Sequence, residues 1–443
     1  MRSADLLITG GTVLTVDEPG TVVPDGAVVV RDGTIVEVGP ADVVAGRYEP
    51  AEVLDVRGCL VMPGLVNTHA HLAMNLFRGE ADDVSLEEFL RRVLRAELVQ
   101  LTAEAVAVGV EAALAECLRG GITTALDMYW YPEAATEVAD RVGFRLLNGP
   151  SFMDVIDPDG RDFDRRMAWA EELLTQRRAA DPAAPVWVMP HSAYMLSREQ
   201  LERVMALARR FDARVHTHAA ESPGETAAVL DRHGERPIDV LDAAGVLGPR
   251  TVLAHGVQLD AGEISLLARR GTAVAHCPVS NLFLGCGIAP LPQLLQAGVP
   301  VGIGTDGAAS CGALDIFAGI RLAAMLHKGV TQDPRTVGAE RAVRLATTGG
   351  AAALGLGDRV GALTAGRRAD IVVADLHRLH VVPNTDVWSA VAYGLTPADV
   401  RHTIVDGRVL LRDRVLRTID EASVLDRMTD LRRTRSLDLK ERL

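Results

Sequence analysis

The chain has 443 residues, a length that suits a barrel with an accessory layer better than one small domain. Its net charge of −13 argues against nucleic acid or an anionic membrane surface as a partner. The first ten residues lack the long apolar core of a signal peptide, and no apolar run is long enough to span a bilayer. We therefore expect an acidic cytoplasmic protein that binds a small molecule and forms a homo-oligomer.

Both ends of the chain have the composition of β-strands. Residues 1–61 contain three stretches rich in Val, Ile and Leu, and Asp32-Gly33 between two of them predicts a hairpin. The pattern returns in residues 363–443, where Asp406-Gly407 marks a second hairpin turn before a terminal helix. These two segments are expected to pack together as one small β-sandwich.

Residues 62–362 alternate short apolar strands with amphipathic helices. Ser85 opens a capping box before one helix, and another helix follows Ser197. The expected strands end near His71, Met128, Pro150, His191, His218, His255, Cys277 and Asp306. Eight strands alternating with helices predict a (β/α)8 TIM barrel, an α/β fold whose active site lies at the carboxyl ends of the strands.

A histidine pair closes the first of these strands, in the sequence PGLVNTHAH. Because side chains two residues apart on a strand point the same way, His69 and His71 can reach one cation. His218 ends a second apolar strand and Asp306 a third, where an unpaired buried carboxylate would be costly. Three imidazoles and one carboxylate suit zinc or another first-row divalent metal.

The sequence HTHAAE leaves one choice open and adds an acid. His216 and His218 share a face by period, so spacing alone does not decide which of them is the ligand. Glu221 lies just beyond the metal and is expected to act as a proton shuttle. His255 ends the next strand and is expected to orient the water or polarise the bond under attack.

Lysine and cysteine narrow the kind of metal site. Lysine occurs only at Lys328 and Lys440, so no strand end offers the carboxylated lysine that bridges two metals in some barrel enzymes. We therefore expect one divalent metal per chain, zinc first and iron(II) as the alternative. The five cysteines form no CxxC pair, and Cys286 and Cys311 are expected to line a pocket rather than act as nucleophiles.

Longer motifs carry a resemblance to a known family. They are PGLVNTHAH (63–71), HAAE (218–221), AHG (254–256), HCPVSNLFLGCGIAP (276–290) and GTDGAAS (304–310). Over nearly its whole length the chain resembles the amidohydrolase superfamily, in its cytosine deaminase and chlorohydrolase branch. Within the branch it is most similar to the 5'-methylthioadenosine/S-adenosylhomocysteine deaminases, through residues 71–90 and the PHSAY sequence at 190–194.

The resemblance implies roles for individual residues. It implies a zinc site with the ligands His69, His71, His218 and Asp306. Glu221 would protonate a ring nitrogen, and His255 would position the hydroxide or polarise the target carbon. His191 and Glu97 would contact a nucleoside.

The chain departs from the family pattern in the outer pocket. Phe89 stands where the family has Trp, and Cys311 and Gly312 replace two Asn. No Arg ends the third barrel strand, which reads Asn148-Gly149-Pro150, and Arg161 is only a loose match to a second substrate-binding Arg. We therefore expect 5'-methylthioadenosine and S-adenosylhomocysteine to be used less well than by typical relatives.

The sequence thus predicts a metal-dependent aminohydrolase acting on a purine, adenosine derivative, pterin or similar N-heterocycle. Zinc-bound hydroxide would attack the amino-bearing ring carbon, Asp306 would take the water proton, Glu221 would protonate the ring, and ammonia would leave. One alternative is a chlorohydrolase that uses the same hydroxide on a triazine-like ring. The other is a non-catalytic barrel scaffold, which the intact set of four ligands disfavours.

Overall fold

The computed structural model describes residues 1–182 and 184–441, with side chains described as far as Arg433. Residues 442 and 443, at the end of the predicted C-terminal segment, lie outside the described part, as does the side chain of Lys440. Within the described residues, no helix combines the length and apolar character needed to cross a membrane.

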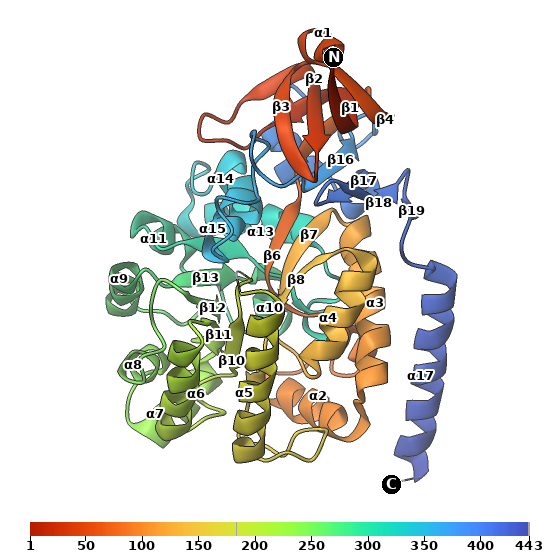
Figure 1. Ribbon diagram of the computed structural model, residues 1–443. Coiled ribbons are helices and arrows are strands. Elements are labelled where there is room, and N and C mark those ends of the chain that lie inside the picture. Colours follow the sequence, from red (N-terminus) through yellow and green to blue (C-terminus); the bar gives the residue numbers. More distant parts are fainter. Residues whose placement is uncertain (183, 442–443) are drawn as a thin grey trace.

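The two ends of the chain meet in one mixed sheet of nine strands, at the top of Figure 1. Its strands are β1 (Arg2–Leu14), β2 (Val22–Arg31), β3 (Thr34–Pro40), β4 (Tyr48–Asp55), β5 (Cys59–Pro63), β16 (Ile371–Asp375), β17 (Val400–Val405), β18 (Arg408–Arg412) and β19 (Val415–Leu416). N- and C-terminal strands join where β5 pairs antiparallel with β16. Both predicted hairpins are confirmed, since β2 pairs with β3 and β17 with β18 across their Asp-Gly turns. The sandwich itself stays a prediction.

Alternation along β2 explains how this sheet is covered. Val28 and Val30 pack in one apolar cluster with residues of β16, while Val29 packs in another beside Val44 of the short helix α1 (Ala41–Val44). Successive side chains of a strand point to opposite faces, so an uninterrupted valine run serves both clusters.

The middle of the chain supplies two parallel sheets. The six-stranded sheet contains β9 (Ser151–Phe152), β10 (Trp187–Pro190), β11 (Arg214–Ala219), β12 (Thr251–His255), β13 (Ala273–His276) and β14 (Val301–Ile303). The four-stranded sheet contains β15 (Asp306–Gly307), β6 (Leu65–His71), β7 (Ile122–Asp127) and β8 (Arg145–Asn148). Alternating helices and parallel strands confirm an α/β fold.

The third and eighth predicted strands are each divided in two. The break between β8 and β9 falls at Gly149-Pro150, where proline has no N–H for a sheet hydrogen bond. The break between β14 and β15 falls at Gly304-Thr305. There Gly304 N donates to His276 O of β13 and Thr305 N donates to His69 O of β6. The chain passes from one sheet to the other at this point.

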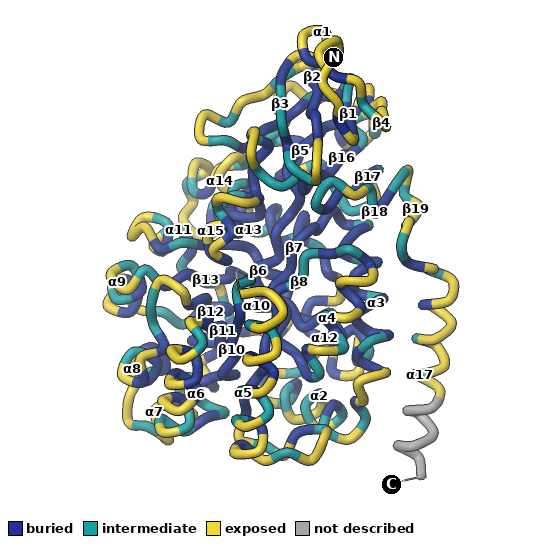
Figure 2. The backbone as a smooth tube through the Cα atoms, in the orientation of Figure 1, coloured by how far each residue is buried: buried dark blue, intermediate teal, exposed yellow. Residues whose placement is uncertain are grey.

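Helices surround these sheets in Figure 1. Figure 2 shows that the strands are buried and that the surrounding helices expose their outer faces. The longer ones are α2 (Leu86–Gln100), α3 (Ala103–Arg119), α4 (Pro132–Val142), α5 (Phe163–Ala180), α6 (Arg198–Arg210), α7 (Pro223–His233), α9 (Ala261–Arg270), α13 (Ile316–Thr331) and α17 (Glu421–Glu441). The shorter ones are α8 (Pro237–Ala243), α10 (Pro278–Phe283), α11 (Leu291–Gln296), α12 (Ala308–Cys311), α14 (Ala339–Arg344), α15 (Gly350–Ala353) and α16 (Val387–Ser389).

The two predicted helix starts are present, with one difference. Ser197 forms a complete capping box with Gln200 at the start of α6. At α2 the Ser85 side chain accepts from Glu88 N, but the Glu88 carboxylate pairs with Arg91 and Arg92 instead of the N-cap backbone. Glu88 is therefore held by charges of its own helix.

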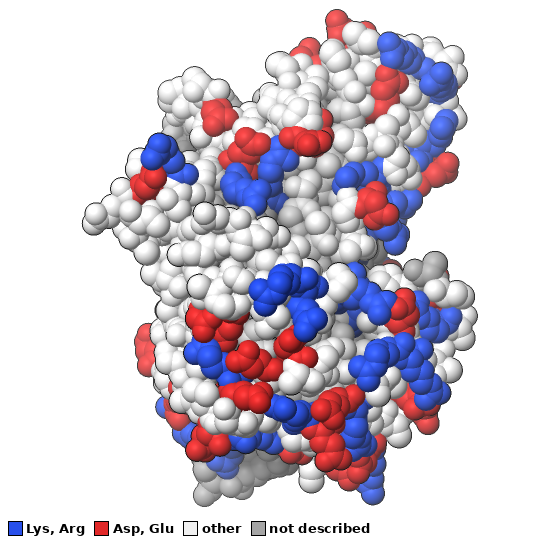
Figure 3. All heavy atoms as spheres, turned by 90° about the vertical axis from the view of Figure 1, so that its left-hand side faces the viewer, with Lys and Arg blue, Asp and Glu red and all other residues white. Residues whose placement is uncertain are grey.

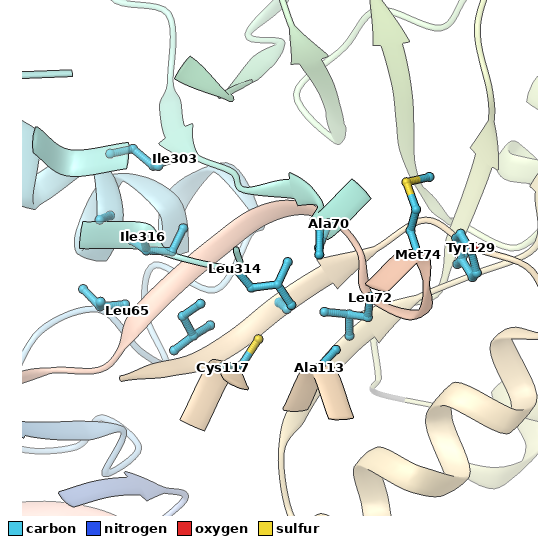
Figure 4. Packing of buried hydrophobic residues seen from close by; sticks show 14 of the residues in the cluster. Leu65, Ala70, Leu72, Met74, Ala113, Cys117, Tyr129, Ile303, Leu314 and Ile316 are labelled. Carbon is cyan, nitrogen blue, oxygen red and sulfur yellow. The ribbon is translucent and has the colours of Figure 1, made fainter. Parts of the chain in front are cut away.

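The strand that carries the histidine pair is held by apolar contacts. Figure 4 shows Leu65, the first residue of β6, and Leu72, which directly follows the strand, on the side of β6 that faces Ala113 and Cys117 of α3. All four belong to one buried cluster. On the outer face that carries α7, α8 and α9, Figure 3 shows acidic and basic side chains interspersed, below a band with few charges.

Candidate metal centre and substrate pocket

Three imidazoles and a carboxylate converge at the carboxyl ends of β6 and β11 and at the first residue of the short strand β15. His71 Nε2 lies 3.2 Å from His218 Nε2. Asp306 Oδ1 lies 3.5 Å from His69 Nε2 and 3.4 Å from His71 Nε2. The parallel pairing of β15 with β6 places the aspartate beside the histidine pair. The structure therefore brings together the four residues that the sequence predicted as metal ligands.

Carbonyl oxygens hold the far sides of two of these rings. His71 Nδ1 donates to Met128 O at 2.5 Å, and His218 Nδ1 donates to His191 O at 2.9 Å. Because a carbonyl only accepts, the proton of each neutral ring is on Nδ1 and the Nε2 lone pair is free. Burial and nearby imidazoles lower the pKa of His218 well below its usual range, which keeps that ring neutral.

His216, the ligand alternative left open by the sequence, lies behind His69 instead. Its Nε2 is 2.7 Å from His69 Nδ1, and its Nδ1 is 2.9 Å from Val252 O. Burial lowers the pKa of His216 to about 3. Both histidines of the HTH sequence share a face of β11, but His218 lies nearer the strand's carboxyl end, beside the other candidate ligands.

Helix α10 supplies two polar contacts that sequence reasoning missed. Ser280 Oγ donates to Asp306 Oδ2 at 2.5 Å, and Asn281 Oδ1 lies 2.9 Å from His255 Nδ1. Gly307 N donates to the other aspartate oxygen at 2.7 Å. The only available signal was a Ser-Asn pair inside an otherwise apolar motif, because the helix must be placed in space before its partners are known.

His255 and Asp306 also have left-handed backbones, with φ of 77° and 69°. This region costs a non-glycine residue about 1–3 kcal/mol and is found where the surrounding structure enforces it, often at functional sites. Here His255 is the last residue of β12 and Asp306 the first residue of β15, and both side chains belong to the cluster. Sequence reasoning gave no indication of this strain.

Glu221 and Asp306 are buried carboxyl groups in opposite states. Glu221 Oε1 lies 3.6 Å from His255 Nε2. Burial, reinforced by neighbouring carboxylates, raises the pKa of Glu221 well above its usual range and favours the protonated acid. Burial alone would also raise the pKa of Asp306, but its pKa lies well below the usual range, and Ser280 Oγ and Gly307 N donate to its two oxygens and favour the ionised form. One carboxyl group can donate a proton while the other stays ionised.

The residues present fit a divalent metal. His69 Nε2 is fully buried and has no hydrogen-bond partner, and an unsatisfied buried acceptor is costly. The ligand atoms of His69, His71 and His218 lie within 4.8 Å of one another, as do those of His69, His255 and Asp306. In the described part of the chain, these two candidate metal-binding groups share His69 and belong to one cluster. A single ion bound by three imidazoles and a carboxylate satisfies these atoms.

Among the described residues, neither candidate metal group includes a cysteine, and Lys328 lies on α13. Lys328 Nζ donates to Tyr393 Oη at 2.6 Å, on α13. Burial raises the pKa of the Cys286 and Cys311 thiols, so both stay protonated. Neither lines the pocket described below, so that expectation is wrong: Leu284, from the same loop as Cys286, lies on the wall instead.

A pocket opens above the convergent nitrogens. Its polar floor is formed by His71, His191, His218, Glu221, His255 and Asp306. Its apolar wall is formed by Met74, Leu86, Phe89, Leu90, Val93, Leu94, Met128, Met153, Met195 and Leu284. Helix α2 supplies much of this wall, and every residue expected to bind substrate, His191, Glu97 and Phe89, lines the pocket.

Two aromatic residues hold Glu97 at the edge of the pocket. Tyr129 Oη donates to Glu97 Oε1 at 2.6 Å, and Trp130 Nε1 donates to Glu97 Oε2 at 3.1 Å. Arg161, the loosely matched arginine, lies in a neighbouring cavity and pairs with Asp159 at 2.5 Å. Trp130 lines both cavities.

A buried arginine that the sequence did not suggest lies in the same neighbouring cavity. Arg166 pairs with Asp157, and its guanidinium lies over the Trp130 ring. Both guanidinium groups of this cavity are therefore neutralised by carboxylates.

Comparison with known proteins agrees with the site. The model of the amidohydrolase family matches residues 60–410. The chain belongs to the amidohydrolase family. It is 40% identical over 431 residues to a 5-methylthioadenosine/S-adenosylhomocysteine deaminase of Syntrophobacter fumaroxidans, covering 97% of this chain and 98% of that one.

Two solved structures are similar to this amidohydrolase-family chain. An adenosine deaminase of Xanthomonas campestris with bound zinc has a TM-score of 0.95 and 37% identity, covering 98% of this chain and 99% of that one. An atrazine chlorohydrolase of Arthrobacter aurescens complexed with zinc has a TM-score of 0.86 and 28% identity, covering 96% and 100%.

Proposed function

We propose that this protein is a metal-dependent aminohydrolase that deaminates an aminated N-heterocycle and releases ammonia. One observation carries the proposal. Four ligand residues converge beside the buried acid Glu221 on the floor of an apolar pocket, in a chain of the amidohydrolase family. When bound to His69, His71, His218 and Asp306, zinc would supply a water molecule with its pKa lowered towards ~7.

The side chains divide the remaining work. Asp306 accepts a proton from the attacking water, and Glu221 donates its own proton to the ring nitrogen beside the target carbon. His255 Nδ1 faces the Asn281 amide oxygen, which leaves Nε2 as an acceptor that orients the water. The water oxygen bonds to the ring carbon, the carbon–amine bond breaks, and the amino group takes the proton held by Asp306 and leaves as ammonia. The remaining hydroxyl proton returns to Glu221, which leaves a carbonyl on the ring.

The pocket supports a flat ring substrate. The polar groups lie on the floor, whereas the wall is built from leucine, methionine, valine and phenylalanine side chains. Such a wall removes water from around the reacting ring and strengthens the electrostatic interactions inside. Purines, adenosine derivatives and pterins present an amino carbon next to a ring nitrogen, as this arrangement of acid and ligands requires.

We further propose that the two parallel sheets are parts of one closed eight-stranded barrel within residues 62–362. The backbone hydrogen bonds of Gly304 and Thr305 to strands of different sheets support this. Residues 1–61 and 363–443 would then form the accessory β domain.

Assaying a panel of aminated purines, adenosine derivatives, pterins and aminotriazines for ammonia tests the proposal. The panel includes 5'-methylthioadenosine and S-adenosylhomocysteine, and chlorotriazines are assayed for chloride. Ammonia from at least one heterocycle, abolished when a chelator removes the metal and restored by zinc, is expected. Chloride without ammonia would replace the proposal with the chlorohydrolase alternative.

A further inference from the structure

We propose that His216 is a positioning residue for the metal site, because it fixes the nitrogen of His69 that carries the proton. In this way it keeps His69 Nε2 available as a ligand. The inference rests on the proposed metal site but is independent of the substrate.

A chain of two imidazoles runs from a backbone carbonyl to the candidate metal. Val252 O only accepts, so His216 Nδ1, 2.9 Å away, must carry the proton. His216 Nε2 is then an acceptor, and His69 Nδ1, 2.7 Å away, must be the donor. This leaves His69 Nε2 with a lone pair, and that atom is buried without a hydrogen-bond partner.

His69 differs in this respect from the other two histidine ligands. His71 and His218 each donate directly to a backbone carbonyl oxygen. His69 is completely buried, and the partner of its Nδ1 is a second, equally buried imidazole. The HTH sequence of β11 thus contributes one ligand to the site and one orienting acceptor behind it.

Removing the His216 acceptor leaves two possible states of His69, and both are unfavourable for metal binding. Either the Nδ1–H stays buried and unpaired, which is costly, or the proton moves to Nε2 and blocks the lone pair. Asp306 Oδ1, 3.5 Å from Nε2, would attract that proton. Both outcomes weaken metal binding. Loss of such an orienting partner typically lowers metal affinity by roughly 10–100-fold.

Three variants separate positioning from packing. His216→Phe keeps a ring of similar size but no acceptor. His216→Gln places an amide oxygen near the former Nε2 and can accept from His69 Nδ1. His276→Gln is the matched control, because His276 is a buried imidazole on β13 whose ring nitrogens have no partner among the described residues.

Zinc affinity is measured by competition with a chromophoric chelator, on metal-stripped full-length protein whose fold is checked by circular dichroism. We expect His216→Phe to lose about 10–100-fold, with His216→Gln recovering most of the loss and His276→Gln matching the unchanged protein. A folded His216→Phe that binds zinc as tightly as the unchanged protein would overturn the proposal. Equal losses in His216→Phe and His216→Gln would do the same.

A second measurement needs no variant. Nitrogen-15 spectra of the metal-free, histidine-labelled protein report which ring nitrogen of each imidazole is protonated. We expect Nδ1–H at both His69 and His216, and an Nε2–H tautomer at either would refute the proposal even if His216→Phe failed to fold. Zinc binding without ammonia release from any heterocycle would remove the proposed function and leave this inference standing.

Discussion

At the scale of single residues, the pocket separates two carboxyl groups of similar intrinsic acidity. Glu221 is buried beside other carboxylates and holds its proton, while Asp306 accepts from Ser280 Oγ and Gly307 N, which favours its ionised form. Pairs of groups whose pKa values are driven apart by their environments mark an acid and a base. Residue identity suggested both roles, but the difference between them comes from the surroundings.

Replacing Glu221 by glutamine tests the acid. Since general acids contribute about 10²–10⁴-fold, we expect kcat to fall by that factor while zinc content stays unchanged. Elemental analysis beside steady-state kinetics makes the measurement. Full activity would exclude the proton-donating role, and loss of zinc would make Glu221 a ligand.

The same substitution is expected to stabilise the protein near neutral pH. The folded-state pKa of Glu221 is raised, so its ionisation opposes folding as the pH rises above the unfolded value of about 4.3. Glutamine removes this penalty, so we expect the variant to have a higher free energy of unfolding than the unchanged protein at pH 8 and nearly the same one near pH 4. Urea unfolding at the two pH values measures this, and an equal effect at both would contradict the assigned shift.

The candidate ligands could be predicted at this scale, whereas the residues that support them could not. His69, His71, His218 and Asp306 each lie at or near the end of an apolar run of the sequence, so a strand assignment alone brought them to one edge. Ser280, Asn281 and the partner of His69 depend on how a helix and neighbouring strands lie in space. Spacing within one strand could not decide whether His216 or His218 is the candidate ligand, because that also depends on where the neighbouring strands lie.

At the scale of elements, the passage from β14 to β15 decides whether Asp306 reaches the histidines. Gly304 lies in this passage, and a Cβ there would lie 2.9 Å from both Cys277 Sγ and His69 Cβ. The sequence predicted one uninterrupted strand here. Periodicity could not reveal the break, because it comes from close contact between two strands that are distant in the chain.

Gly304→Ala is therefore expected to push β15 away from β6 and disturb the ligands. We expect a loss of about 1–3 kcal/mol in stability, typical of overpacking, together with weaker zinc binding. Gly329→Ala on α13 is the control, since its added Cβ meets no atom within 4 Å and alanine favours helices. Thermal unfolding and zinc titration of both variants make the comparison, and unchanged zinc binding in Gly304→Ala would show that this contact does not set the site.

At the scale of the whole molecule, a buried ion pair joins the central strands to the sheet made by the chain ends. Arg145, the first residue of β8, donates to Asp370 at 2.7 Å and to Asp406 at 2.5 Å. Asp370 precedes β16, and Asp406 lies in the turn between β17 and β18. The hairpin signals predicted that both ends form β-structure, but the charges that attach it to β8 are separated by more than two hundred residues.

Arg145→Met tests this attachment. The substitution leaves Asp370 buried and unpaired, and removing one partner of a buried ion pair typically costs about 3–5 kcal/mol. We expect a loss of that size in urea unfolding, whereas Arg335→Met, which breaks an exposed pair with Asp333, should change stability by less than about 1 kcal/mol. Turnover of the folded Arg145→Met protein should be unchanged, because Arg145 begins β8 while the ligands lie at carboxyl strand ends. A folded variant with normal stability but lost turnover would show that the terminal sheet acts on the site itself.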